Sequence, residues 1–295
     1  MRTPEEQASI RLDAFRWLEA KLQSGQSEFT HTELKNYTYL GERIPLKDGQ
    51  RGIWNPRDFE ATLSITTSLA DQYADRLGDD LNLEYSYQAR DGGDNTKLEL
   101  AMTSHTPLIY FRAIRSGVYV AYYPAYVVAA NESTRKFSVA LDETMRFFID
   151  PASMSFDQRR YAERTVKQRL HQPVFRAKVM RAYANTCAVC LLKHAELLDA
   201  AHIVADTEAG GFANVSNGLA LCKLHHAAFD RDLLGITPDF NVQIRRDLLA
   251  EKDGPMLRHG LQDMHGRPLH VPTYRANQPS RDALAGRYAE FEAKQ

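Results

Sequence analysis

The segment from Cys187 to Asp230 determines how the C-terminal part of this chain is organised. It contains CAVC at 187–190, LDAAHI at 198–203 and NGLALCKLHHAAFD at 217–230. The short apolar run at 197–201 predicts a β-strand, and AAFD at 227–230 suggests a helix. Cysteines, histidines and an asparagine therefore gather on short neighbouring elements, which favours a site with chemistry over a plain apolar core.

All three cysteines of the chain, Cys187, Cys190 and Cys222, lie inside this segment. An odd number clustered in this way indicates thiolates on a metal in a reducing compartment, because disulfides would leave one thiol over. Cys187 and Cys190 form one half-site, and Cys222 with His225 repeats the spacing, so we expect a Cys3His zinc site. Such a zinc would stabilise a segment with too little apolar surface to fold alone. Ordinary buried cysteines are the alternative, which the lack of cysteines elsewhere disfavours.

His202 follows the expected strand. A neutral imidazole at this place can take a proton from a water that attacks a phosphodiester, with a pKa near the working pH. A single histidine on an apolar segment is more often a hydrogen-bonded core residue, so its neighbours decide between the two interpretations. Asp199 lies three residues earlier on the opposite strand face, and we expect it to support the site rather than to react.

His226 and Asp230 stand at positions i and i+4 of the expected helix, so their side chains point the same way and can hold one divalent cation. A simple His–Asp helix pair is the alternative. Asn217, five residues before Cys222, can bridge two strands and orient the base or the metal. The other interpretation is that Asn217 is simply a turn residue in the pair Asn217-Gly218.

Together these residues resemble the HNH, or ββα-metal, nuclease family, in its branch of restriction endonucleases. The resemblance covers roughly residues 170–260 and rests on LDAAHI, NGLALC and HAAFD. It implies that His202 is the general base, that Asn217 is the family's asparagine and that His226 is its last histidine. It also implies a structural zinc on the cysteine-rich set named above and a divalent cation at the catalytic centre.

Two positions depart from the pattern of this family. Ala201 stands where the family often places a His or Asp metal ligand, which leaves the catalytic cation with fewer protein ligands. Asp230 stands where a His is common, and an oxygen ligand there favours Mg²⁺ or Mn²⁺ over zinc. His225 is open to two uses, as a zinc ligand or as an active-site residue.

The chain's charge is unevenly distributed. Its net charge is −1, yet residues 151–295 carry 20 Lys and Arg against 16 Asp and Glu, whereas residues 1–150 carry 17 against 22. Between 159 and 181 eight bases face a single acid, Glu163. A charge run is often only a solvated helix face, but beside a nuclease motif we expect these bases to contact DNA phosphates. They are Arg159, Arg160, Arg164, Lys167, Arg169, Arg176, Lys178 and Arg181.

The N-terminal half predicts a β-rich domain. Alternation at 83–87, runs rich in β-branched and aromatic residues at 107–114 and 118–128, and a short run at 137–141 predict strands. Their order weakly resembles the SRA fold, a PUA-like curved sheet that reads modified cytosine. That resemblance implies a pocket in which aromatic rings clamp a flipped base and an acid reads its amine. Packing of the β core is the other interpretation of these tyrosines. The candidate residues are Tyr73, Tyr85 and Tyr87 with Asp71 or Asp75.

Helices frame both halves. Thr3, Pro4 and Glu6 predict a capped helix that ends at Gly25, and Thr30 with Glu33 predicts a second. A helical stretch at 156–184, broken near Gln172-Pro173, and a C-terminal helix at 280–295 are also expected. The fold class is thus α+β, in three parts. Residues 1–150 would form a mixed reader domain with a curved antiparallel sheet, 151–185 a basic helical linker, and 186–295 a zinc-stapled ββα-metal domain.

These expectations describe a DNA endonuclease that hydrolyses phosphodiester bonds with a divalent cation and is directed by modified cytosine. One HNH site nicks one strand, so cleavage of double-stranded DNA would need a homodimer. Two alternatives stay open: a restriction enzyme for unmodified sites with a partner methylase, and a non-catalytic zinc-stapled DNA-binding protein. No apolar run approaches a membrane helix and the N-terminus lacks a signal-peptide core, so we expect a cytoplasmic protein that does not enter membranes.

Overall fold

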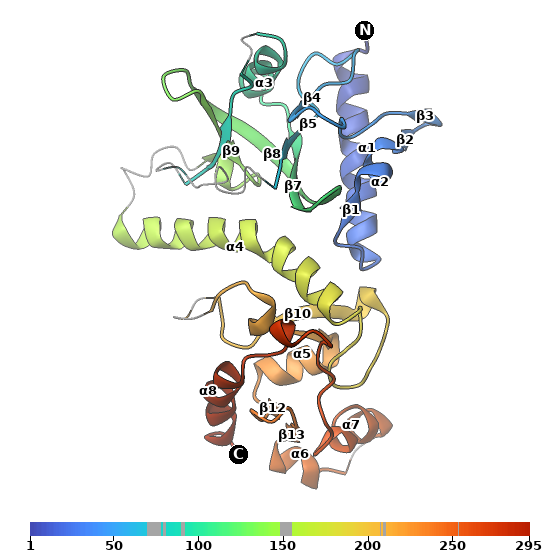
Figure 1. Cartoon of the computed structure of the whole chain (residues 1–295), viewed down its shortest axis with the longest axis vertical. Coiled ribbons are helices and arrows are strands. Elements are labelled where there is room, and N and C mark those ends of the chain that lie inside the picture. Colours follow the sequence, from blue (N-terminus) through green and yellow to red (C-terminus); the bar gives the residue numbers. More distant parts are fainter. Residues whose placement is uncertain are drawn as a thin grey trace. The chain divides into compact units, whose positions relative to one another are not determined.

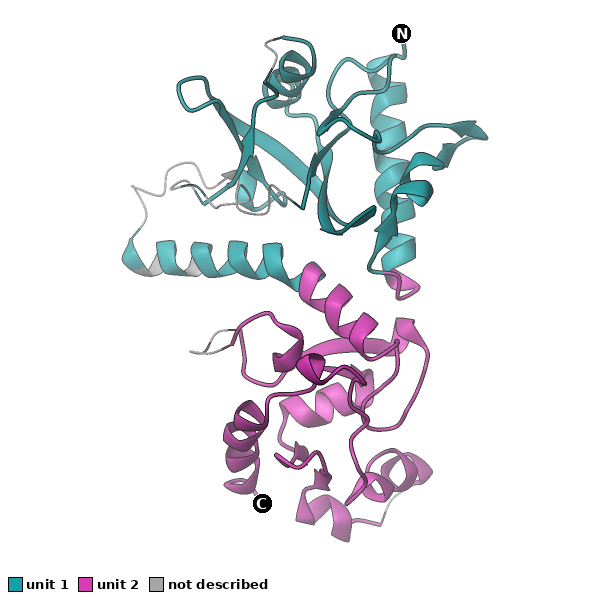
Figure 2. Cartoon of the chain, viewed as in Figure 1, with its two compact units in different colours: residues 1–22, 27–173 teal, residues 23–26, 174–295 magenta. Residues whose placement is uncertain are grey.

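The computed structural model describes residues 1–69, 78, 81–89, 92–147, 155–206, 208, 211–252 and 254–295. The chain divides into two compact units, residues 1–22 with 27–173 and residues 23–26 with 174–295 (Figure 2). The boundary expected near Pro151 lies outside the described residues. No helix in the described part of the chain has the length and apolar character to cross a membrane.

The first unit begins with the capped helix that the sequence predicts, α1 (Pro4–Gln23). The Thr3 N–H donates to the Glu6 carboxylate at 2.9 Å, and the Glu6 N–H donates to Thr3 Oγ1 at 3.2 Å. These reciprocal bonds satisfy two donors at the helix start that have no partner within the helix. The second capping box also forms, at Thr30 before α2 (His31–Lys35). One face of α1 is buried in a cluster with residues of β1 and β7, strands of the sheet of this unit.

A curved mixed sheet occupies the rest of the first unit, with strand order β4-β5-β7-β8-β9-β6 and β1 paired with β8 (Figure 1). A short hairpin, β2 (Thr38–Tyr39) with β3 (Glu42–Arg43), stands apart from it. The sheet strands are β1 (Phe29–Thr30), β4 (Ile53–Trp54), β5 (Ser64–Thr67), β6 (Leu83–Ser86), β7 (Leu108–Arg115), β8 (Val118–Asn131) and β9 (Lys136–Ala140). The four expected strands thus correspond to β6, β7, β8 and β9.

The expectation of a wholly antiparallel sheet is wrong at one pairing, because β5 runs parallel to β7. Parallel neighbours need a long crossover connection, and here it contains β6 and the helix α3 (Asp94–Thr103). Sequence analysis found neither β5 nor α3. At four residues β5 is too short for a clear alternation, and three of its residues are buried.

The basic helix α4 (Phe156–Ala182) is continuous, so the expected break near Gln172-Pro173 is wrong. Proline within a helix removes one backbone hydrogen bond and commonly bends the helix, and here the helix continues past it. Tyr122 Oη donates to the Leu170 carbonyl at 2.6 Å, which ties the first part of α4 to β8.

The second unit places an antiparallel strand pair before a helix. β10 (Leu198–His202) pairs with β11 (Gly218–Cys222), so that Leu198 lies opposite Cys222 and His202 opposite Gly218. The helix α5 (Lys223–Asp230) follows β11 directly. The second unit also contains the strands β12 (Leu234–Ile236) and β13 (Val242–Ile244) and the helices α6 (Arg246–Ala250), α7 (Pro255–Gly260) and α8 (Arg281–Glu292). Its short 3-10 helices are η4 (Ala195–Leu197), η5 (Val215–Asn217), η6 (Gln262–Met264) and η7 (Arg275–Asn277). Among the described residues of the first unit, η2 (Met145–Phe147) is a 3-10 helix.

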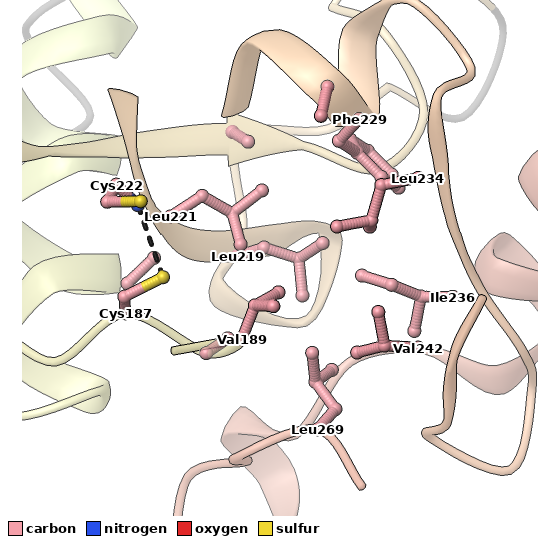
Figure 3. Close-up of a cluster of buried hydrophobic side chains, with 14 of the residues drawn as sticks. Cys187, Val189, Leu219, Leu221, Cys222, Phe229, Leu234, Ile236, Val242 and Leu269 are labelled. Atoms are coloured by element: carbon pink, nitrogen blue, oxygen red, sulfur yellow. Dashed lines mark hydrogen bonds between the residues drawn. The ribbon is translucent and has the colours of Figure 1, made fainter. Parts of the chain in front are cut away.

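An apolar core joins these elements. Leu219 and Leu221 of β11 meet Leu234, Ile236 and Val242 of the small β12–β13 pair (Figure 3). The C-terminal helix α8, expected from the sequence, adds Leu284 to the same cluster. The core therefore fixes β11 and α5, which carry Cys222, His225, His226 and Asp230.

Candidate active site and metal centre

Four potential ligands converge where β11 meets α5. The Sγ atoms of Cys187, Cys190 and Cys222 and a ring nitrogen of His225 all lie within 4.8 Å of one another. The turn at 187–190 is attached to β11 by the Ala188 N–H, which donates to the Ala220 carbonyl at 2.7 Å. Figure 3 shows the Cys222 N–H directed at Cys187 Sγ, at 3.3 Å. In the part of the chain that the structure describes, this is the only group of three or more His, Cys, Asp or Glu side chains that can hold a metal.

His225 is oriented for this cluster. Its Nε2 lies 2.7 Å from the Gly260 carbonyl, which can only accept, so Nε2 carries the proton. Nδ1 is then the free acceptor, 3.0 Å from Cys222 Sγ and 3.6 Å from Cys187 Sγ. Contacts with Cys190 and Cys222 lower the pKa of the Cys187 thiol, which favours the thiolate that binds metals. Three thiols and one imidazole with a backbone partner fit a structural zinc. The sequence left His225 open as a zinc ligand or as an active-site residue, and its ring has the geometry of a zinc ligand.

His202 ends β10 with its ring against Phe175, the ring centroids 3.9 Å apart and the planes within 13°. Its Nε2 is buried and has no hydrogen-bond partner among the described residues. Burial lowers the pKa of His202, and nearby Asp206 opposes that shift only in part. The imidazole is therefore neutral at neutral pH, which is the form that can accept a proton.

Asn217 holds the two ends of the β10–β11 connection together. Its Oδ1 accepts from the Val204 N–H at 2.9 Å, and its Nδ2 donates to the carbonyls of Val204 and Phe212 at 3.0 and 3.1 Å. The side chain is 5% exposed. Because Val204 is two residues after His202, these bonds fix the backbone that presents the imidazole.

His226 lies between two carboxylates. Its Nδ1 is 3.4 Å from Asp199 Oδ2, and its Nε2 is 3.3 Å from Asp230 Oδ2. The contact with His226, together with Lys223 at 2.7 Å and Arg176 at 3.3 Å, holds the pKa of Asp199 well below its usual range. Because Asp199 is ionised at neutral pH, it favours a proton on Nδ1 and so leaves the Nε2 lone pair for a cation shared with Asp230. The donor set of one imidazole nitrogen and one carboxylate oxygen fits Mg²⁺ or Mn²⁺ with water completing the shell.

Comparison with known proteins identifies the segment that contains these residues. The sequence model of a family described as HNH endonuclease matches residues 187–237. This segment is an HNH endonuclease domain. The protein is accordingly an endonuclease, a hydrolase. Among solved structures, a "Modification dependent TagI restriction endonuclease" aligns over 78% of this chain and 82% of its own, at 17% identity and a TM-score of 0.32. No curated protein matches the chain.

The eight basic residues of α4 have different surroundings. Arg176, beside the HNH domain, is engaged with Asp199, and Arg169 pairs with Asp142 at 3.2 Å. Arg159 pairs with Glu163 at 3.3 Å. Arg160, Arg164 and Lys167 are exposed on the part of α4 that belongs to the first unit. Lys178 and Arg181 line a groove in the second unit.

A cavity of about 630 Å³ opens on the first unit between β5, β6 and β8. Tyr85 and Tyr87 line it, whereas Tyr73 and Asp75, and also Asp71, lie outside the described residues. Tyr87 stacks on Phe137 with ring centroids 4.1 Å apart, and its hydroxyl is buried without a partner among the described residues. Phe137 therefore covers one face of the Tyr87 ring.

Sequence reasoning missed several residues that line this cavity. Tyr119 contributes a half-buried ring with Lys47 Nζ at 4.8 Å from its centroid. Thr66 of β5 contributes a hydroxyl that is buried and unpartnered within the described residues. No local signal distinguishes them: β5, which carries Thr66, was not found from the sequence, and Tyr119 is one of several aromatic residues in the run that predicts β8.

Proposed function

We propose that this protein is a modification-dependent DNA endonuclease, in which the HNH domain hydrolyses a phosphodiester bond and the first unit reads a modified cytosine. The observation that supports the catalytic part best is the pair of histidines. A neutral His202 stands at the end of β10, and His226 of α5 is set by Asp199 to offer Nε2 beside Asp230. An acceptor for a proton and a site for a cation are thus present on adjacent elements.

The reaction follows from these positions. His202 takes a proton from the attacking water as its oxygen bonds to phosphorus, and the bond from phosphorus to the 3′ oxygen breaks. The leaving 3′ oxygen then takes a proton from solvent. A cation held by His226 and Asp230 would stabilise the negative charge on the phosphate and on that leaving oxygen. Asn217 keeps His202 in place through Val204. Phe175 fixes the plane of the imidazole.

We assign Cys187, Cys190, Cys222 and His225 to a structural zinc. The turn that carries the first two cysteines is only four residues long, and a metal bound there would add directly to the stability of the second unit. These four residues meet at the junction of β11 and α5, so a zinc bound by them would fix the start of the helix that carries His226. Its contribution to cleavage would be positional.

The cavity of the first unit supports the reading function. Base flipping costs a few kcal/mol, which is recovered when buried polar atoms and aromatic rings meet the extruded base. Tyr87 and Thr66 line the cavity, and the hydroxyl of each is buried without a partner among the described residues. Tyr119 and Tyr85 also line the cavity and bring aromatic rings to it. Cleavage of both strands would need two copies of the HNH site, so we propose a homodimer on duplex DNA.

The test is cleavage of one plasmid prepared with cytosine, methylcytosine or hydroxymethylcytosine, with Mg²⁺ or Mn²⁺ added to the zinc-loaded protein. We expect cutting of the modified plasmids alone, and loss of cutting with His202→Ala. Equal cutting of all plasmids would remove the modified-cytosine part and favour an enzyme for unmodified sites. Binding without cutting under every condition would favour the non-catalytic zinc-stapled protein. Thr66→Val, which keeps the size of the side chain and removes its hydroxyl, should reduce the preference for modified DNA.

A further inference from the structure

A groove of about 450 Å³ runs beside the end of α4 in the second unit. Three separate segments form it: the last turns of α4, the residue that begins η5, and the chain that leads into η7. Its principal lining residues are Lys178, Arg181, Val215, Thr273, Tyr274 and Asn277.

The chemistry of this groove matches a nucleic-acid backbone. Lys178 and Arg181 are three residues apart on one helix, so their side chains lie on the same face. Tyr274 is 70% exposed, which means that its ring contributes little to the core. Two cations beside an exposed aromatic ring can bind phosphates and stack on a sugar or base. Thr273 and Asn277 add hydrogen-bonding side chains.

The groove is attached to the active-site loop. Val215 lines the groove and begins η5, and Asn217 at the end of η5 is bonded to Val204 next to the catalytic strand. The Ser216 carbonyl accepts from the Ser280 N–H at 2.8 Å, which joins η5 to the segment that follows η7. A ligand in the groove therefore contacts the same loop that positions His202.

We infer that this groove binds the backbone of duplex DNA on one side of the cleaved bond. Lys178 and Arg181 would contact phosphates, and Tyr274 would pack on the adjoining sugar or base. This inference rests on the proposed cleavage of DNA, and it adds a binding surface whose lining residues, apart from Val215, lie outside the HNH segment at 187–237. Such contacts position the strand but carry no sequence information.

The experiment measures binding of a short duplex to the full-length, zinc-loaded protein in a His202→Ala background, which prevents cutting. The groove variants are Lys178→Ala/Arg181→Ala and Tyr274→Ala. The matched control is Arg246→Ala/Arg258→Ala, which removes two exposed cations from α6 and α7, at the opposite end of the second unit from α4 (Figure 1). The double groove variant should weaken binding and reduce the slope of log Kd against log salt by about 2, and Tyr274→Ala should weaken binding roughly 5- to 100-fold. The control should bind like the parent.

Cutting by the same variants with His202 intact gives the second measurement. We expect KM to rise and kcat at saturating DNA to stay near the parental value, because the groove does not contact the reacting atoms. Unchanged Kd and salt slope in both groove variants would overturn the inference and leave the nuclease assignment standing. If the parent neither binds nor cuts any duplex, the proposed DNA cleavage itself is wrong and the groove assignment fails with it. Tyr274→Phe should retain binding, which separates packing of the ring from bonding of its hydroxyl.

Discussion

Replacement of Asn217 by alanine tests how the active-site loop is held. The side chain makes three hydrogen bonds of 2.9, 3.0 and 3.1 Å, to the Val204 N–H, the Val204 carbonyl and the Phe212 carbonyl. A neutral hydrogen bond contributes about 0.5–1.5 kcal/mol, so Asn217→Ala should cost the loop about 2–4 kcal/mol. Since about 1.4 kcal/mol is a tenfold change in an equilibrium, local opening should increase roughly 30- to 700-fold.

Amide hydrogen exchange at Val204 is the direct assay, because that N–H is bonded to Asn217 itself. The nicking rate should fall roughly 10- to 100-fold, since a small displacement of His202 is costly, while zinc content stays at the parental level. Asn217→Asp should be no better than alanine, because its second carboxylate oxygen would face two carbonyl oxygens.

Asn214→Ala is the matched control. Asn214 is exposed and accepts the Asn217 N–H at 2.9 Å as the cap of η5, so its loss should cost only about 1 kcal/mol. If Asn217→Ala and Asn214→Ala show the same exchange at Val204 and the same nicking rate, Asn217 is a simple turn residue and the reasoning is refuted.

The other predictions concern the base, the cation and the zinc. His202→Ala should lower the cleavage rate roughly 10²- to 10⁴-fold with unchanged DNA affinity, and parental cleavage would show that another group is the base. Burial lowers the His202 pKa and the neutral ring is the active form, so kcat/KM should rise with pH through a midpoint below the usual histidine pKa of about 6.5. Asp206→Asn should move that midpoint lower, and a parental midpoint above about 6.5 would contradict the assignment. Asp230→Ala should be rescued in part by added Mg²⁺ or Mn²⁺, as judged by initial rates, whereas His202→Ala should not be. Cys190→Ser should lose zinc and destabilise the second unit, as measured by elemental analysis and thermal unfolding; a stable, active protein without zinc would exclude the site.

Features that depend on near neighbours in the chain were predicted well. Both capping boxes form at the predicted threonines, because their bonds span three residues and need no distant partner. The i, i+4 spacing brings His226 to Asp230 on one helical turn. The C-x2-C and C-x2-H spacings were readable as a metal cluster for the same reason. The strands β7 and β8 were recognisable because long runs of β-branched and aromatic residues identify them.

Features that depend on pairing and packing were not predicted. β5 pairs with β7 in parallel, and the connection between them includes α3. No residue of β5 indicates this pairing. The cavity of the first unit brings Thr66 of β5 to the same wall as Tyr87, which follows β6, and Tyr119 of β8, strands far apart in the sequence.

The sequence by itself determined which residues are the candidates for the chemistry: three cysteines, His202, Asn217 and the His226–Asp230 pair. Tertiary structure decided how each of these side chains is placed and which partners it meets. Gly260, thirty-five residues from His225, sets the tautomer that turns Nδ1 toward the thiols. The packing of α5 on β10 brings Asp199 to His226. The formation of a hydrogen bond and the position of a proton on an imidazole depend on angles and distances that only the fold fixes. The identity of the ligands and their spacing along the chain can be read from the sequence.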